Sequence, residues 1–125
     1  MSNEIFCFGS NLRGVHGAGA AAHALKHHGA KWGVGIGRTG NAYGIPTKDI
    51  QIRTLPLSRI VSYVEGFILY AIEHPELTFN VTRIGCGLAG YKDIDIAPMF
   101  DQATHNCKFD IAWEVYLPNH HSVIF

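Results

Sequence analysis

The glycine-rich segment 9–21 lies between an apolar run and an alanine-rich run, and it most constrains what this chain can fold into. The preceding Ile-Phe-Cys-Phe lacks alternation, which predicts a strand over residues 4–8 that is covered on both faces. Residues 18–28 predict a helix, with Gly29 placed to end it. A strand, a small-residue turn and a helix N-terminus form a site for anions, because glycine lets backbone N–H groups approach a phosphate closely.

A second glycine-rich loop has the same setting. Residues 84–91, Ile-Gly-Cys-Gly-Leu-Ala-Gly-Tyr, follow an apolar run and precede a predicted helix. Two such loops in 125 residues predict the phosphate-facing walls of one nucleotide pocket; the alternative is that the small residues serve tight strand–helix packing. The first loop is neither a dinucleotide fingerprint nor a P-loop, since no acidic residue lies near position 39 and no Gly-Lys-Ser/Thr follows.

Alternating strand and helix patterns fill the rest of the chain. The longest helix opens at residues 56–58, with Thr54 or Ser58 as its expected N-cap, and ends at Pro75. Its apolar residues recur every three or four positions, which predicts one buried stripe. The other predicted elements are strands at 42–46, 77–84, 109–117 and 122–125, a helix at 94–104 and an irregular segment at 29–41.

The order of these elements predicts an α/β fold in a single domain spanning residues 1–125. We expect a three-layer α/β/α arrangement, with helices on both faces of a mainly parallel or mixed sheet. Ligands bind outside the carboxyl ends of the strands in such sheets. Both glycine loops, Thr47 and Lys48 follow predicted strand ends, so we expect them to converge on one rim.

Composition excludes several classes of protein. Ten Lys and Arg balance ten Asp and Glu, so the chain lacks the basic surface of a general nucleic-acid binder. Cys7, Cys86 and Cys107 are widely spaced and form no CxxC pair, which indicates neither a disulfide framework nor a zinc site. No signal peptide and no apolar run long enough to span a bilayer is visible, so we expect a cytoplasmic protein without a membrane partner.

Three side chains near the predicted rim have candidate chemistry, and each has a plainer alternative. Lys48 is either a cation or amine beside a sugar or phosphate, or an ordinary solvated lysine. His16 is either a general acid–base group or a structural histidine. Cys86 is either a thiolate nucleophile with His16 as its base, or a small apolar residue packed under the loop.

Two further features bear on metals and ligands. His23 and His27 have the i, i+4 spacing of zinc ligands, but no third ligand lies in a fitting place. The sequence therefore predicts neither a metal nor a cofactor. Tyr91 either covers an adenine or ribose, or closes its loop over the core.

Three motifs, in this order along the chain, resemble elements of the macrodomain family, whose members bind ADP-ribose. Residues 11–21, Asn-Leu-Arg-Gly-Val-His-Gly-Ala-Gly-Ala-Ala, resemble the loop after the first core strand of macrodomains. Residues 45–48, Ile-Pro-Thr-Lys, resemble the Pro-Thr-Lys element of DNA ADP-ribosylglycohydrolase antitoxins of the DarG type. Residues 83–91 resemble the Gly-Cys-Gly-Leu-Gly-Gly loop of the same branch, which includes terminal ADP-ribose glycohydrolases. Small phage and prophage proteins related to ADP-ribose-1''-phosphate phosphatases look similar.

The resemblance implies roles for individual residues. Asn11 would contact the distal ribose, and Lys48 would attack or polarise the anomeric carbon, as the matching lysine does in the glycohydrolase branch. His16 replaces an apolar residue of the family and could serve phosphatase-like chemistry instead. The other ligand-binding residues that the resemblance implies are Gly14, Gly17, Ala18, Gly19, Thr47, Gly85, Cys86, Gly87, Leu88, Ala89, Gly90 and Tyr91.

The implied activity is hydrolysis of a bond at the distal ribose of an ADP-ribosyl derivative. Its partner would be ADP-ribose or an ADP-ribosylated substrate, which includes an ADP-ribosylated nucleic acid. The intact Pro-Thr-Lys element at residues 46–48 favours this hydrolase. The alternative is a non-catalytic binder that sequesters an ADP-ribose-containing signal or modified group, and it is favoured by Ala89, which stands where some glycohydrolases of the branch have an aspartate. The aspartate that holds the adenine amine in many macrodomains also has no match in this chain.

Overall fold

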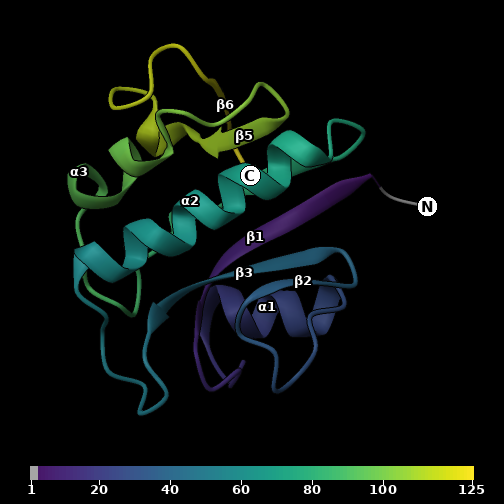
Figure 1. Cartoon of the computed structure of the whole chain (residues 1–125), viewed down its shortest axis with the longest axis vertical. Helices are drawn as coiled ribbons and strands as arrows, with labels where there is room; N and C mark the ends of the chain where they lie inside the picture. The colour runs from purple at the N-terminus through teal and green to yellow at the C-terminus, as the bar shows by residue number, and fades with distance from the viewer. Residues whose placement is uncertain (1–2) are drawn as a thin grey trace.

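A six-stranded sheet organises the computed structural model, which describes residues 3–125 (Figure 1). The strand order is β2-β3-β1-β4-β5-β6, and every neighbouring pair is parallel except β2 with β3. The expectation of an α/β fold with a mainly parallel or mixed sheet is therefore confirmed. The strands are β1 (Glu4–Asn11), β2 (Gly37–Thr39), β3 (Ala42–Lys48), β4 (Thr78–Val81), β5 (Cys107–Asp110) and β6 (His121–Val123).

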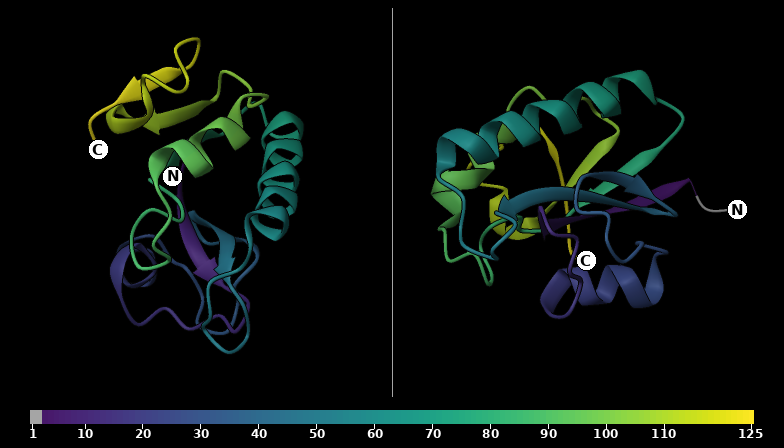
Figure 2. Two further views of the ribbon diagram at one scale, coloured as in Figure 1. Left: turned by 90° about the vertical axis from the view of Figure 1, so that its left-hand side faces the viewer. Right: turned by 60° about the horizontal axis from the view of Figure 1, so that its bottom comes forward.

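Helices cover both faces of the sheet, as the three-layer arrangement requires. Helix α1 (Gly19–His27) lies on one face, and α2 (Leu57–Glu73) lies on the other (Figure 2). The α2 side also holds the short α3 (Asp93–Ile96) and the 3₁₀ helix η1 (Ala97–Phe100). A second 3₁₀ helix, η2 (Ile111–Trp113), follows β5. No helix in the described part of the chain is long and apolar enough to cross a membrane.

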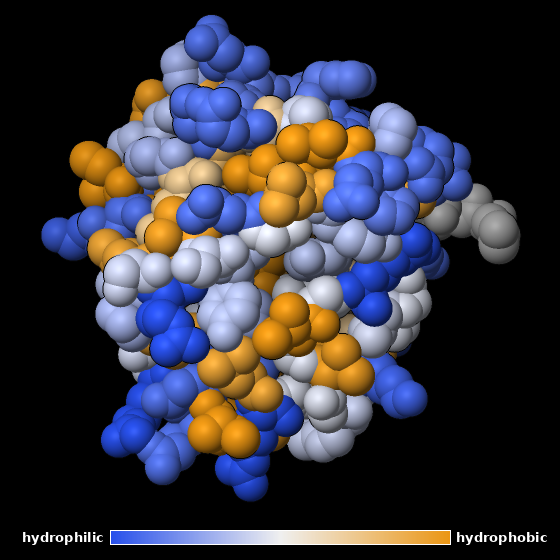
Figure 3. All heavy atoms as spheres, in the orientation of Figure 1, coloured by the Kyte–Doolittle hydropathy of each residue, from blue (hydrophilic) through white to orange (hydrophobic). Residues whose placement is uncertain are grey.

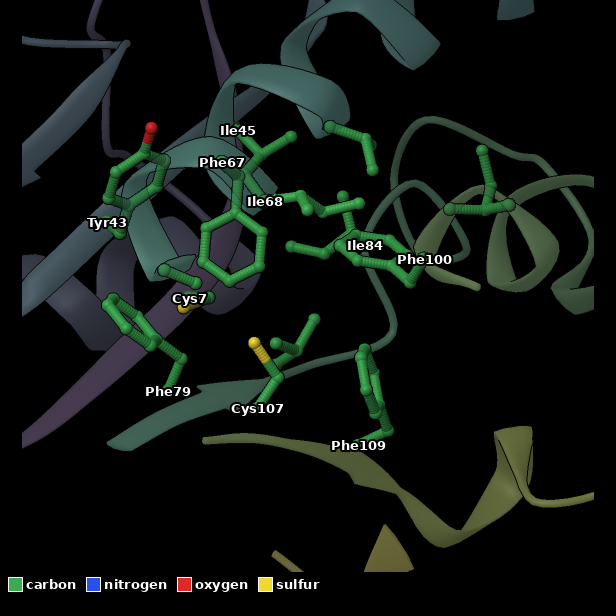
Figure 4. Close-up of a cluster of buried hydrophobic side chains, with 14 of the residues drawn as sticks. Cys7, Tyr43, Ile45, Phe67, Ile68, Phe79, Ile84, Phe100, Cys107 and Phe109 are labelled. Carbon is green, nitrogen blue, oxygen red and sulfur yellow. The ribbon is translucent and has the colours of Figure 1, made fainter. Parts of the chain in front are cut away.

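Strand β1 divides the core because its side chains alternate between the two faces. Ile5 and Cys7 belong to the larger buried cluster, on the α2 side. Phe8 belongs to a smaller cluster with alanines of α1. Most of the predicted apolar stripe of α2 is buried, although Ile72, one of its expected members, is 49% exposed. Phe67 lies among side chains from several strands (Figure 4). The buried residues of that stripe are Ile60, Val64, Phe67, Ile68 and Ala71.

Helix α1 is slightly shorter than expected, whereas strands β1 and β3 are longer than expected. Helix α1 matches the expected 18–28 within a residue at each end, and Gly29 follows it with φ +76°. Strands β1 and β3 continue three and two residues beyond their expected ends, so Asn11 and Lys48 each close a strand. The irregular segment 29–41 contains one short antiparallel strand, β2.

The strand expected over residues 109–117 is wrong after Asp110. The Asp110 side chain accepts the N–H of Ala112 at 2.9 Å and starts η2 instead. Trp113 and Leu117 are fully buried, but Ile111, which belongs to the same alternating apolar set, is 43% exposed, so the alternation did not predict one buried face. Val115, between them, is 77% exposed.

Further predicted boundaries also differ from the structure. The helix expected over 94–104 is interrupted after Ile96, because Pro98 lacks the N–H that an α-helix needs and η1 follows. The strand expected over 77–84 is limited to β4, and the edge strand expected over 122–125 lies at β6. Neither Thr54 nor Ser58 caps α2; Pro56 is its N-cap residue.

The face that α2 crosses carries separate small groups of apolar side chains among polar ones (Figure 3). Leu69 and Ile72 are exposed on α2 itself. Isolated exposed apolar side chains are ordinary on protein surfaces.

Candidate functional site

A cavity of about 540 Å³ lies at the carboxyl ends of β1 and β3. The N-terminus of α1 and the loop after β4 complete its wall. Segments far apart in the sequence therefore meet at the rim expected for a mainly parallel sheet. The lining residues are Gly9, Asn11, Val15, Gly17, Ala18, Gly19, Ala20, Ala21, Thr47, Lys48, Ile52, Thr82, Arg83, Ile84, Gly85, Cys86, Gly87, Leu88 and Ala89.

The cavity brings together most of the residues that the sequence nominated. Those that line it are Asn11, Gly17, Ala18, Gly19, Thr47, Lys48, Gly85, Cys86, Gly87, Leu88 and Ala89. Four nominated residues are not among the lining residues: Gly14, His16, Gly90 and Tyr91.

Asn11 shapes the first glycine loop. Its Oδ1 accepts the N–H of Val15 at 3.0 Å, and its Nδ2 donates to the Val15 carbonyl at 2.8 Å. The loop then enters α1 at Ala18, which provides no side-chain cap. Within the described residues, the first-turn N–H groups of Gly19, Ala20 and Ala21 have no hydrogen-bond acceptor. These donors border the cavity and are available to an anion.

The second glycine loop is fixed by its own backbone. The N–H of Cys86 donates to Arg83, and the N–H of Tyr91 donates to the Gly85 carbonyl at 2.9 Å. Gly85 has φ +77°, and a Cβ there would come within 3.2 Å of Ile96. The N–H of Gly90 donates to the Gly87 carbonyl at 3.0 Å, whereas four N–H groups of the loop have no acceptor in the described part of the chain: those of Gly85, Gly87, Leu88 and Ala89.

Two side-chain hydrogen bonds join this loop to the segment before α2. Thr54 donates its hydroxyl to the Ala89 carbonyl at 3.1 Å. Tyr91 donates its hydroxyl to the Leu55 carbonyl at 2.6 Å and packs against the larger buried cluster. Tyr91 therefore closes the loop over the core, which is the plainer of the two roles the sequence left open.

The charged side chains that line the cavity are both basic. Lys48 has no carboxylate partner within residues 3–125, where the ion pairs are Arg53 with Asp49 and Arg83 with Asp93. Arg83 donates from Nε and Nη2 to the two carboxylate oxygens of Asp93, at 2.9 and 2.8 Å. No carboxylate of the described residues lines the cavity itself. The site is therefore suited to an anionic ligand.

Asp93 holds Arg83 in place from outside the cavity. It also accepts the indole N–H of Trp113 at 2.7 Å. The Arg83 hydrogen bonds, more than any other contact, hold the pKa of the Asp93 carboxyl below its ordinary value. Sequence reasoning did not nominate Arg83; the available signal was its place at the end of a predicted strand, directly before the glycine loop.

His16 does not line the cavity, although its neighbours Val15 and Gly17 do. It is 1% exposed. Its Nε2 lies 3.0 Å from the Lys31 carbonyl and 3.1 Å from the Val34 carbonyl, so Nε2 carries the hydrogen. The ring also packs edge-on against Phe8 and Trp32. This geometry supports the structural alternative for His16; its acid–base role stays a prediction.

Gly14, like His16, contacts residues of the 29–37 segment and does not line the cavity. It has φ +76°, and a Cβ there would overlap the backbone of Gly33. The Gly33 N–H donates to the Gly14 carbonyl at 2.8 Å. A Cβ on Gly35 would likewise overlap the carbonyl oxygen of Asn11. Gly14 of the loop and Gly35 of the 29–37 segment therefore let the two backbones lie directly against each other.

Cys86 lines the cavity as a protonated thiol. Burial, assisted by the nearby Asp93 carboxylate, raises its pKa to about 12. Its Sγ lies 3.5 Å from the Ile84 carbonyl, while His16 is hydrogen-bonded to other residues. A cysteine nucleophile needs the thiolate, so the arrangement supports the packing role for Cys86.

The histidine-rich end of α1 lies apart from this cavity. The rings of His23 and His27 are 4.7 Å apart between centroids. Residues 3–125 hold no group of three or more His, Cys, Asp or Glu that could bind a metal ion.

Comparison of the chain with family models, with curated proteins and with solved structures gave no match.

Proposed function

We propose that this protein binds ADP-ribose and hydrolyses a bond at the distal ribose of an ADP-ribosyl derivative, as a macrodomain would. One observation carries the proposal: both glycine loops and Lys48 line a single cavity of about 540 Å³. Small-molecule sites typically have volumes of roughly 300–1,000 Å³. The three motifs that resemble macrodomains thus have a shared place in the fold, and the sheet with helices on both faces supports the same family.

The donors around the cavity suit a diphosphate. Unpaired N–H groups come from the second loop and from the uncapped N-terminus of α1, whose dipole favours negative charge. Lys48 and Arg83 add positive charge, and no carboxylate of residues 3–125 lines the cavity to oppose it. Phosphate binding energy would then hold the distal ribose against the end of β3.

Lys48 supplies the reactive group in this proposal. Its neutral amine attacks the anomeric carbon, and the bond to the leaving group breaks as that group takes the bonding electrons and a proton. Water then hydrolyses the adduct, which releases ADP-ribose and restores the amine. The protonated amine would instead offset negative charge on the departing oxygen. Lys48→Arg separates the two routes, because arginine keeps the charge but does not form the adduct.

The second candidate is a binder without turnover, and a specific observation favours it. Ala89 lies in the cavity wall at the position where some glycohydrolases of the branch have an aspartate. No Asp or Glu of the described residues lines the cavity in its stead. Water activation by a general base therefore has no evident group here. In this case the protein would sequester an ADP-ribose-containing signal or modified group.

Calorimetry with ADP-ribose tests both candidates first, with AMP and ribose 5-phosphate as controls. We expect micromolar binding, about −8 kcal/mol, and weaker binding of both controls. Absence of ADP-ribose binding would refute both functions. Hydrolysis is then assayed with ADP-ribose-1''-phosphate, an ADP-ribosylated protein and ADP-ribosylated DNA.

Lys48→Ala distinguishes the hydrolase from the binder. The hydrolase predicts that the variant loses turnover by at least about a hundredfold and keeps ADP-ribose affinity within a few fold. Lys26→Ala, at an exposed site in the last turn of α1, is the matched control and should retain both. If the wild-type protein binds ADP-ribose and turns over none of the substrates, the binder is the better account.

A further inference from the structure

Ile52 is held in a backbone conformation that its side chain disfavours. Its φ of +64° makes it the one non-glycine residue of the described chain with positive φ. A β-branched residue there is a genuine outlier, because Cβ crowds the following carbonyl. Glycine or asparagine would suit the position better.

The turn between β3 and α2 enforces this conformation (Figure 1). The Asp49 Oδ1 accepts the N–H groups of Gln51 and Arg53, at 2.8 and 2.9 Å. The Ile52 N–H donates to the Asp49 carbonyl at 3.0 Å, and the Asp49 N–H donates to the Arg53 carbonyl at 2.8 Å. These hydrogen bonds define the turn without any need for an isoleucine.

Core packing does not explain the isoleucine either. Ile52 is 37% exposed and belongs to neither buried cluster. Its neighbour Ile50 is 65% exposed and does not line the cavity. What distinguishes Ile52 from Ile50 is its place in the cavity wall.

A second exposed apolar side chain comes to the same cavity from the other glycine loop. Leu88 lines the cavity although it is 70% exposed, and its Cδ1 would lie 3.5 Å from a Cβ built on Gly19. The hydrogen bond from Thr54 to Ala89 ties the Leu88 loop to the segment that follows Ile52. Two apolar side chains thus adjoin the anion-binding donors, from two connected segments.

We propose that Ile52 is a specificity-determining residue of the cavity, which contacts the carbon skeleton of a nucleoside while the glycine loops bind its phosphates. With Leu88, it makes the site favour a nucleoside diphosphate derivative over a bare phosphate group. The strained turn persists because glycine or asparagine there would remove this contact. The inference rests on the proposed ADP-ribose site and assigns it a specificity element.

The test measures ADP-ribose affinity and thermal melting for wild type, Ile52→Gly, Ile52→Val and the matched control Ile50→Gly. Both glycine variants increase the flexibility of the unfolded chain equally, so their difference in melting temperature reports the strain at position 52. We expect Ile52→Gly to melt above Ile50→Gly and to bind ADP-ribose about tenfold more weakly than wild type, a loss of about 1.4 kcal/mol. Ile52→Val and Ile50→Gly should bind within about twofold of wild type.

The affinity for inorganic pyrophosphate, measured by competition with ADP-ribose, shows whether Ile52→Gly removes a contact with the nucleoside or disturbs the whole cavity. Its affinity should be the same in wild type and Ile52→Gly, because it has no carbon skeleton. Equal ADP-ribose affinity in wild type and Ile52→Gly overturns the proposal, as does an equal loss for ADP-ribose and pyrophosphate. A wild-type protein that does not bind ADP-ribose refutes the proposed function itself, and this inference with it. If the wild-type protein binds ADP-ribose and Ile52→Gly binds it equally well, the inference about Ile52 fails and the proposed function stands.

Discussion

Replacing His16 tests whether the contacts between the first glycine loop and the 29–37 segment stabilise the fold. The ring is 1% exposed, and its Nε2 contacts the carbonyls of Lys31 and Val34. In His16→Ala the Val34 carbonyl loses its side-chain donor, whereas the Lys31 carbonyl keeps the Val34 N–H at 3.1 Å, and the segment that carries them loses one of its attachments to the loop. The substitution also removes a ring that packs edge-on against Phe8 and Trp32.

The magnitude of the effect follows from these contacts. A part-buried carbonyl left without a donor, as at Val34, costs about 1–3 kcal/mol. Loss of a buried ring and the resulting cavity add roughly 2 kcal/mol, at the low end for truncation to alanine. The free energy of unfolding should therefore fall by about 3–5 kcal/mol, a large part of the roughly 5–15 kcal/mol typical of whole proteins. The melting temperature should fall by roughly 10 °C or more.

Urea unfolding followed by circular dichroism measures this loss, and His16→Gln is the companion variant. Glutamine keeps an N–H donor at a similar reach, so it should recover part of the stability. Both variants should bind ADP-ribose within about threefold of wild type at temperatures where they are folded.

Two results would refute this account of His16. A loss of less than about 1 kcal/mol in His16→Ala would show that the hydrogen bonds and ring contacts contribute little. A stable His16→Gln that binds ADP-ribose normally and fails to hydrolyse an ADP-ribosyl derivative that the wild-type protein turns over would return His16 to an acid–base role.

Two further predictions concern the loops around the cavity. The pKa of Asp93 lies below its ordinary value because Arg83 donates to it, so its stabilising effect is present above pH about 4 and is lost as pH falls through the lower folded pKa. Asp93→Asn should therefore lower stability at pH 7 and flatten the acid dependence of urea unfolding between pH 5 and 2; an unchanged slope would contradict this. Gly35→Ala should lower the melting temperature strongly because its methyl group would overlap the Asn11 carbonyl. The control Gly66→Ala, with open space around it in α2, should stabilise by roughly 0.5–1 kcal/mol, and equal effects of the two substitutions would refute the clash.

The strand–loop–helix order could be predicted from the sequence because it depends on local signals. Apolar runs, a single buried stripe in α2 and glycines after strands are all visible in short windows. They sufficed to predict the α/β class and the rim at which Lys48 and both loops lie. The predicted ends of elements were wrong where tertiary contacts outweighed the local pattern. Trp113, for example, was expected in a strand and is a buried residue of a 3₁₀ helix.

The sequence did not show which residues of the first loop line the cavity and which pack against the 29–37 segment. Gly14 and Gly17 look alike in a motif, yet Gly14 packs on Gly33 and Gly17 lines the cavity. His16 could be assigned either role until its hydrogen-bond partners, 15 and 18 residues away, were known. Motifs specify which residue types a loop needs, whereas the direction of each side chain depends on what packs behind it.

The sequence by itself determined the layers of this protein and the edge of the sheet at which both glycine loops and Lys48 meet. Only the tertiary structure decided which residues form that site, since a cavity is bounded by segments that meet across the sheet. Arg83 and Ile52 line the cavity although the sequence predicted neither as a site residue: the Asp93 carboxylate, ten residues along the chain, holds Arg83, and the local turn at residues 49–53 holds Ile52 at φ +64°. Short stretches of sequence indicate which residues are buried and which backbone conformation they favour. The lining of a cavity depends in addition on contacts between segments that are distant in the sequence.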